Sequence, residues 1–195
     1  MVLDNQTNKD LREMLKSKLM VMLDLVAPLD TQVEDRVTTA INLAEQYVFD
    51  AVNVSVFERE IIDEVKEPPV FYLDKVPAKR LIAFIDKDDN EIVIDSNTPH
   101  YFKLARNKIS VKRSDSYLPS NQIEAIKYLV GIEQGDAQPL LVVLTLAKRI
   151  YSTVLLNTDI TQSASVATKD GVIFIDDLPP YIKRLMDSIA HILIL

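Results

Sequence analysis

The chain has 195 residues, of which 48% are hydrophobic and 26% charged, and its formal net charge is -7 at pH 7. This hydrophobic fraction supports a packed core and excludes disorder of the whole chain. The acidic balance argues against a wide, non-specific grip on nucleic acid, which needs clustered Lys and Arg. The absence of cysteine excludes disulfides, thiol catalysis and cysteine-ligated zinc.

The first ten residues are polar and lack the apolar segment of a secretory signal. The longest continuous apolar runs, such as Leu140–Leu144, are too short to span a bilayer. We therefore expect an intracellular protein without a membrane partner, or a part of something assembled inside a cell.

Two amphipathic helices are predicted at the start, because apolar residues recur there at helical spacing. The first covers residues 8–26 and stops before Pro28, with an apolar stripe of Leu11, Met14, Leu15, Met22, Leu23 and Val26. The second covers residues 31–52, where Thr31 and Glu34 have the spacing of a capping box. Its predicted apolar face contains Val33, Val37, Ala40, Ile41, Ala44, Val48 and Ala51.

The middle of the chain changes to short segments rich in branched and aromatic residues, which are typical of strands. Asp86–Asn90 is a polar stretch that predicts a hairpin turn. We expect strands over residues 70–73, 80–85, 91–94, 101–104, 108–111 and 125–132. These segments predict a small β region inserted between helices.

Helical spacing returns after Asp136, which we expect to cap a helix that has Pro139 in its first turn and continues to about Val154. Residues 157–171 are polar and rich in Ser and Thr, as in a loop or flexible arm, and residues 172–175 suggest a short strand. A last helix is expected over Tyr181–Leu195, opened by Leu178-Pro179-Pro180.

These elements predict a mainly α fold, a helical bundle with a small inserted antiparallel β region and an extended C-terminal arm that ends in a helix. We divide the chain into an N-terminal extension helix at 1–29, a core at 30–158 with its β insertion at 54–132, and a C-terminal arm with a docking helix at 159–195.

A search for chemistry finds no phosphate-binding glycine loop, dinucleotide fingerprint or serine elbow. His100 and His191 lie on different elements, without zinc-ligand spacing. Asp86, Asp88 and Asn90 resemble the start of a calcium loop, but the required glycine and glutamate positions hold Glu91 and Asn97. We therefore expect no catalytic residues, cofactor or metal.

Two further features leave alternatives open. Lys108, Lys112 and Arg113, near Tyr117, fit either a contact with DNA or RNA or a basic guard on an edge strand. His191 is followed by four apolar residues, Ile192–Leu195. This apolar end either folds back onto its own core or enters a groove on another subunit, with residues 157–171 as its tether.

The order of parts from about Thr31 to Leu195 resembles the head–tail connector adaptors of tailed bacteriophages, also called head-completion proteins. The resemblance rests on patterns of folding. They are Ala44-Glu45-Gln46-Tyr47-Val48, Pro68-Pro69-Val70-Phe71-Tyr72-Leu73, the hairpin of residues 81–94 with Tyr101-Phe102-Lys103-Leu104, Tyr128-Leu129-Val130-Gly131-Ile132, the Pro139 helix with Ala147-Lys148-Arg149-Ile150-Tyr151, and Leu178-Pro179-Pro180-Tyr181. Two departures are the added first helix and the segment Gly131–Gln138, where relatives often have a more aromatic, glycine-rich sequence.

The resemblance implies a non-enzymatic virion protein that forms a ring, commonly of twelve copies, below the portal. Such a ring extends the channel for double-stranded DNA, without sequence-specific binding, and presents a surface to a tail or nozzle protein. It would occupy the head–tail interface of the virion, and the host cytoplasm during assembly. The implied portal-docking residues are Leu178, Pro180, Tyr181, Ile182, Leu185, Met186, Ile189, Ile192, Leu193 and Leu195.

Two other classes stay open at this stage. One is another phage assembly part, such as a tail-completion protein or an assembly chaperone. The other is a small nucleic-acid-binding protein or a small enzyme without a familiar motif.

Overall fold

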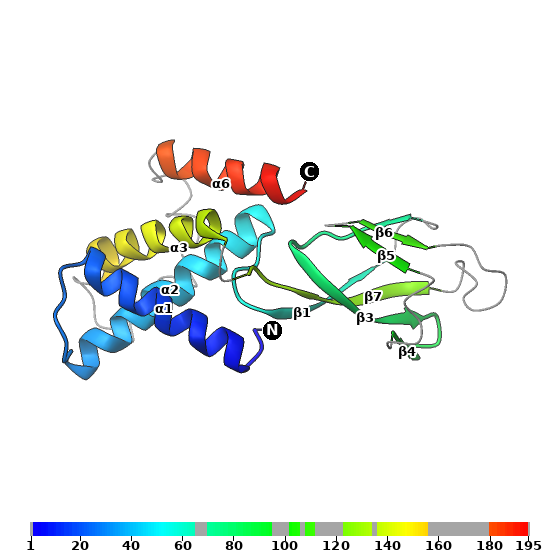
Figure 1. Cartoon of the computed structure of the whole chain (residues 1–195), viewed down its shortest axis with the longest axis horizontal. Helices are drawn as coiled ribbons and strands as arrows, with labels where there is room; N and C mark the ends of the chain where they lie inside the picture. Colours follow the sequence, from blue (N-terminus) through cyan, green and yellow to red (C-terminus); the bar gives the residue numbers. More distant parts are fainter. Residues whose placement is uncertain are drawn as a thin grey trace. The chain divides into compact units, whose positions relative to one another are not determined.

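The computed structural model describes residues 2–64, 70–94, 102–105, 108–111, 123–133, 136–155 and 180–194. The chain divides into two compact units. The helical unit comprises Asp4–Val52 and Glu133–Ala190, and the β unit comprises Met1–Leu3, Asn53–Ile132 and His191–Leu195. Figure 1 shows the helices and the strands of these units.

The helical unit contains α1 (Gln6–Met22), α2 (Thr31–Val52) and α3 (Ala137–Ile150), and α3 continues into the π-helical turn η1 (Tyr151–Leu155). The unit also holds most of α6 (Pro180–Ile194). α2 packs against α3, and α1 contacts both (Figure 1). Because apolar residues recur every three or four positions, each helix turns one stripe inward. The buried stripes include Leu11, Leu15 and Leu19 of α1, Val37, Ile41, Ala44 and Val48 of α2, and Leu140, Val143, Leu144 and Ala147 of α3.

The start of α2 lies where the sequence predicts it, but its cap differs. The Asp30 carboxylate accepts a hydrogen bond from the backbone N–H of Gln32 (3.2 Å), and the Asp30 carbonyl accepts one from the N–H of Glu34 (3.0 Å). Asp30 is therefore the N-cap, and the predicted capping box of Thr31 and Glu34 is wrong. Asp30 also accepts hydrogen bonds well, so a cap one residue earlier satisfies the same orphan N–H groups.

α1 ends four residues earlier than predicted, at Met22. Asp24 adopts a left-handed φ of 55°. The N–H of Leu25 then donates to the carbonyl of Met20 (3.0 Å), and that of Asp24 donates to the carbonyl of Val21 (3.3 Å). This pair of bonds is a Schellman motif, which closes a helix by satisfying its last carbonyls. The apolar pattern continues past the motif, which is why periodicity alone misplaced the end.

The β unit contains two antiparallel sheets. The four-stranded sheet has the order β1 (Arg59–Glu64), β7 (Ile123–Val130), β3 (Ala78–Asp86) and β4 (Glu91–Val93). The three-stranded sheet has the order β2 (Val70–Tyr72), β6 (Lys108–Val111) and β5 (Phe102–Ala105). Every strand predicted within the described residues is present, and β1 is an addition.

The predicted turn at Asp86–Asn90 is confirmed. It joins β3 to β4, and the Asp86 carboxylate accepts hydrogen bonds from the N–H groups of Asp88 and Asn90 (both 2.9 Å). These bonds, chiefly those from Asn90, lower the pKa of Asp86 because they favour its charged form. Asp89 takes a left-handed φ of 59°, which acidic and amide residues tolerate in turns.

The β unit has a hydrophobic core of its own, so the predicted mainly α bundle with a small β insertion is wrong. Leu73, Phe84, Ile123, Ile126, Tyr128 and Val130 form this core. The strand that the sequence analysis missed, β1, pairs with β7 over its full length, from Arg59 with Val130 to Glu64 with Ala125. That pairing makes β7 a central strand and gives the chain an α+β architecture.

Gly131 follows β7 and is required by the packing there. Its φ is +145°, and a side chain at this position would place a Cβ 3.1 Å from the Cα of Glu58. The N–H of Gly131 donates to the carbonyl of Pro77 (3.1 Å), which fixes the exit of β7 beside β3.

Candidate interaction surfaces

Exposed apolar side chains, and the polar contacts around them, are the most distinct surface features of the described residues. Within them, no group of three or more His, Asp or Glu side chains is arranged to hold a metal ion. Among the described helices, none combines the length and the apolarity that a bilayer crossing requires.

The predicted docking residues of α6 fall into three groups. Ile182, Met186 and Ile189, which follow one another at helical spacing, are buried within this chain. Leu185 is half-buried, whereas Pro180 and Tyr181 are exposed, with 57% of Tyr181 accessible. Ile192 and Leu193 belong to α6, but only their backbone is described, and Leu178 and Leu195 lie outside the described residues.

The most exposed large apolar side chains of the described chain flank the end of α1. Val21 is 76% exposed and Val26 is 84% exposed. Ala27 and Pro28 are exposed as well. We call residues 21–29 the apolar corner, because Asp24 is their only charged or polar member. The prediction that Val26 belongs to a buried stripe is wrong, since the chain has already left the helix at Asp24.

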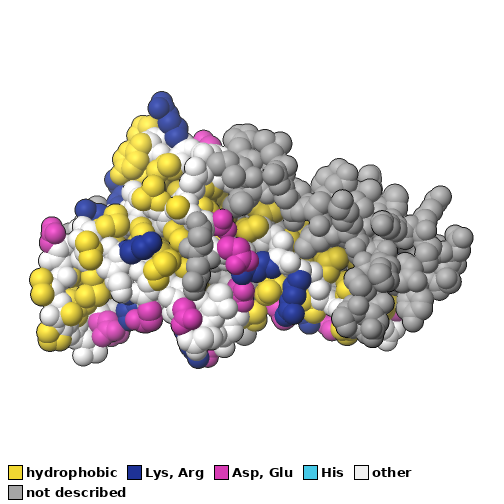
Figure 2. All heavy atoms as spheres, in the orientation of Figure 1, with side chains coloured by type: hydrophobic (Ala, Val, Ile, Leu, Met, Phe, Trp, Pro, Cys, Tyr) yellow, Lys and Arg dark blue, Asp and Glu magenta, His cyan; other side chains and the backbone are white. Residues whose placement is uncertain are grey.

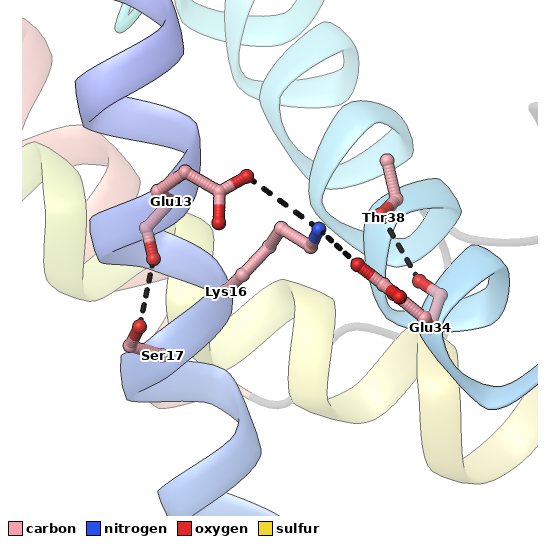
Figure 3. Close-up of polar contacts among 5 residues, drawn as sticks. All are labelled: Glu13, Lys16, Ser17, Glu34 and Thr38. Carbon is pink, nitrogen blue, oxygen red and sulfur yellow. Dashed lines mark hydrogen bonds and ion pairs between the residues drawn. The ribbon is translucent and has the colours of Figure 1, made fainter. Parts of the chain in front are cut away.

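A polar clasp holds α1 to α2 close to this corner (Figure 3). The Lys16 ammonium lies 2.8 Å from a Glu34 carboxylate oxygen and 3.5 Å from one of Glu13. The hydrogen bond with Glu34 is the main cause of a raised pKa at Lys16 and of a lowered pKa at Glu34. Ser17 and Thr38 direct their hydroxyls to the backbone carbonyls of Glu13 and Glu34 (2.9 and 3.0 Å). The clasp joins α1 to α2 at the surface of the helical unit.

The β unit exposes apolar side chains on the face of the four-stranded sheet that points away from its core. Ile62 of β1 is 57% exposed and Val93 of β4 is 63% exposed. Between them, Lys127 of β7 lies 3.0 Å from Glu91 and 3.9 Å from Glu60. Lys127 thus links both edge strands to the centre, and the carboxylate of Glu91 is the main cause of its raised pKa.

A partly buried polar latch, centred on the buried Tyr128, lies on the core side of the same sheet. The Tyr128 hydroxyl donates to the Asp63 carboxylate and accepts a hydrogen bond from the N–H of Lys75 (3.1 Å). The same Asp63 oxygen accepts one from the N–H of Asp74 (3.0 Å). Burial, reinforced by the neighbouring Asp63, raises the pKa of Tyr128. The latch ties the segment before β3 to the two strands β1 and β7.

Most of the remaining residues singled out from the sequence have no described side chain. His100, Lys112, Arg113 and Tyr117 lie outside the described residues, and His191 and Lys108 are described only through their backbone. The predicted cap Asp136 occupies the N-cap position of α3, but its carboxylate accepts from the N–H of Glu133 (3.0 Å) and not from a helix N–H.

Sequence reasoning missed the exposed Val21, Ile62 and Val93. The sequence did contain a signal for Val21. Asp24 interrupts an apolar run, and Pro28 follows four residues later, a pattern that is unusual for a helix face. Ile62 carried a weaker signal, since Glu60 and Glu64 flank it at the alternating positions of a strand.

Comparison with known proteins places the fold. No family model matches the sequence, and no curated protein matches it significantly. Five chains of solved structures are similar to this one, and two of them are the following. A chain from the virion of a native gene transfer agent particle has 11% identity and a TM-score of 0.54, over 91% of this chain and 87% of that one. A chain from the neck of an empty gene transfer agent particle, computed with C6 symmetry, has 10% identity and a TM-score of 0.52, over 79% of this chain and 84% of that one.

Proposed function

We propose that this chain is a structural component of the neck of a phage-like particle, and that it acts there as a head–tail connector adaptor. The observation that carries the proposal is the fold similarity to a chain of a gene transfer agent neck, which covers most of both chains. A passive role also fits the sequence, which lacks the motifs of nucleotide, hydride and acyl-transfer chemistry.

The proposed adaptor forms a ring below the portal, with twelve copies as the expected number. C6 symmetry in the neck structure is compatible with six or with twelve copies of a subunit, because both numbers are multiples of six. In the virion the ring would extend the channel for double-stranded DNA and offer its far surface to a tail or nozzle protein. Before that, its subunits would be in the host cytoplasm.

We propose α6 as the element that meets the portal. Its exposed Pro180 and Tyr181 are available as the helix lies, whereas Ile182, Met186 and Ile189 would first have to leave the helical unit. An aromatic side chain that is exposed beside Lys183 and Arg184 is typical of a binding hot spot. The number of α6 side chains that can contact the portal thus depends on whether α6 stays packed in the helical unit.

The test is the mass of the protein alone and with purified portal rings, followed by electron microscopy. An adaptor gives a complex in which the portal carries a ring of chains of 22.1 kDa each. Failure to bind any portal, neck or tail part, or the loss of the protein from finished particles, would contradict the role. Loss from finished particles would indicate an assembly chaperone.

A matched pair of variants tests the docking residues. Tyr181→Ala should weaken binding to the portal, whereas Ile62→Ala should not, although both side chains are 57% exposed. Equal effects of the two variants would place the docking surface elsewhere. Circular dichroism of both variants establishes that the fold is intact.

The charge of the chain supports DNA passage without tight binding. Residues 4–52 carry nine acidic and five basic side chains, a net of -4 out of the chain's -7. α2 contributes most of this excess, with four acidic residues and one basic residue, whereas α1 has two acidic and four basic residues. Acidic channel walls repel the DNA backbone and let it slide. A DNA-binding titration over a salt series should show no measurable affinity at physiological salt, and a steep salt dependence would instead indicate a nucleic-acid-binding protein.

A further inference from the structure

The apolar corner has the composition of an interface and lies apart from α6. Eight of its nine residues are apolar, and Val21 and Val26 are its most exposed side chains. Figure 2 shows hydrophobic side chains gathered at the end of the helical unit where α1 passes to α2. Surface patches of this kind mark contacts with other proteins.

Along the chain, the corner lies in an acidic interval, with Lys16 and Lys18 as the nearest basic residues before it. No Lys or Arg occurs between Lys18 and Arg36, whereas Asp24, Asp30, Glu34 and Asp35 fall in that interval. Glu34 is engaged by Lys16 and Asp30 caps α2, while Asp24, Asp30 and Asp35 are all exposed. A surface that covers the corner must therefore combine apolar contact area with positive charge.

The outer face of α3 has that combination. Leu141 is 49% exposed, and Lys148, seven positions later on the same face of the helix, is exposed too. α3 contains no acidic residue, while Lys148 and Arg149 lie in its last turn. Thr145 lies between Leu141 and Lys148 on this face and directs its hydroxyl to the Leu141 carbonyl (2.7 Å). The face is thus apolar at Leu141, near one end of α3, and basic at Lys148, near the other end.

We propose that the apolar corner of one copy packs on the outer face of α3 in a second copy. The two surfaces differ, so the contact is head-to-tail, the type from which rings are built. The corner has nine residues, fewer than the roughly 20–30 residues a side of a stable interface, so it would not hold a dimer alone. We therefore expect this contact between copies that an assembly already holds side by side. In this respect the inference rests on the proposed function.

Cysteine cross-linking tests the contact, because the natural chain has no cysteine. One variant carries Val26→Cys and the other Leu141→Cys, with different tags, and the two are mixed before assembly and treated with a short bismaleimide. We expect covalent dimers that contain both tags, several-fold above those from either variant alone. A mixture of Ile62→Cys and Val93→Cys, which are comparably exposed on the β unit, serves as the control.

Two outcomes overturn the contact: mixed-tag dimers no more abundant than in the control, or a ring that assembles without any link. Lys148→Glu gives a second readout and should lower the cross-linking yield several-fold, as should high salt, without altering the circular dichroism of the protein. Ring formation by the natural chain is followed separately by mass. Its absence counts against the proposed function, whereas an unlinked ring counts against this contact alone.

Discussion

The helical unit and the β unit differ in where their elements are joined by polar side chains. In the helical unit, α1 and α2 are joined at the surface by Lys16 and Glu34. In the β unit, Lys127 also joins strands at the surface, through Glu91 and Glu60, but two further polar contacts lie deeper in the fold. Tyr128 bonds Asp63 within the fold, and Lys79 lies 2.8 Å from Glu58 with both side chains mostly buried.

This difference predicts unequal tolerance to substitution. A polar group that loses its partner at the surface regains water, whereas one that loses its partner inside pays the desolvation cost without return. The stability of the helical unit depends mainly on its apolar stripes. Asn8 and Glu45 are the buried polar residues among its described residues. We therefore expect the surface of the helical unit to tolerate substitution. The exposed apolar corner is the part of that surface for which we propose a contact.

The core of the β unit should give the largest effect. Phe84 is fully buried among Ile126, Tyr128 and Val130. Phe84→Ala should lower the free energy of unfolding by about 3–5 kcal/mol, from lost burial and the cavity that remains. Chemical denaturation measures the loss, and hydrogen exchange should show it first in β3 and β7.

The control for that variant is Val93→Ala in the same sheet, since Val93 is largely exposed. Its effect should stay within about 0.5 kcal/mol. If both variants destabilised the protein equally, or if protection fell first in α1 and α2, the β core would not be the independent source of stability described here.

The latch should give the next largest effect. Tyr128→Phe keeps the ring but removes the hydroxyl, so the Asp63 carboxylate and the N–H of Lys75 each lose a partner. The expected loss is about 1–3 kcal/mol in the free energy of unfolding. Tyr181→Phe, at a side chain that is 57% exposed, is the comparison that changes the same atom outside the latch.

The latch also predicts a dependence on alkaline pH. The folded pKa of Tyr128 lies above its unfolded value of about 10. The latch therefore contributes its full stability below pH 10, and this contribution falls as the pH rises further. Wild-type protein should lose stability more steeply than Tyr128→Phe above pH 10. Parallel curves for the two proteins would contradict the assignment.

The helices were predicted well from the sequence because a period of 3.6 residues persists over many turns. The expected bounds of α2, residues 31–52, are those of the structure, and those of α6 differ by one residue at each end. β1 was missed for the opposite reason. Four of its six residues are charged, so neither alternation nor composition separates it from a loop.

Periodicity also leaves open what covers an apolar stripe. The stripe of α6 was predicted correctly as apolar, yet Ile182, Met186 and Ile189 are covered by this chain itself. Val26 shows the reverse case, an apolar residue that the fold leaves in water. Such distinctions depend on how the elements pack, which no local pattern contains.

A smaller, favourable change is expected at the end of α1. Asp24 holds a left-handed φ of 55° within the Schellman motif, where glycine has no steric cost. Asp24→Gly should raise the free energy of unfolding by about 0.5–1 kcal/mol, and Asp24→Ala should lower it. Thermal unfolding of the two variants gives the sign. A gain with alanine would show that the side chain, and not the backbone, is strained there.

The smallest effect is expected from the clasp of α1 and α2. Lys16→Met keeps most of the apolar stem and removes the charge that Glu34 contacts at 2.8 Å. The melting temperature should fall less than it does for Tyr128→Phe, because exposed ion pairs contribute little.

The difference between wild type and Lys16→Met should depend on pH and on salt, because of what the clasp is made of. The pKa of Glu34 is lowered by Lys16, so the contribution of the pair is present above the unfolded Glu value of about 4.3 and is lost as the pH falls through the lower folded value. Salt should reduce the difference through screening. The Tyr128→Phe difference should persist in salt, because a neutral hydroxyl inside the fold is not screened. If the contribution of Lys16 to stability survived both acid and salt, it would come from packing of the side chain and not from the ion pair. The two units would then differ only in how exposed their polar contacts are.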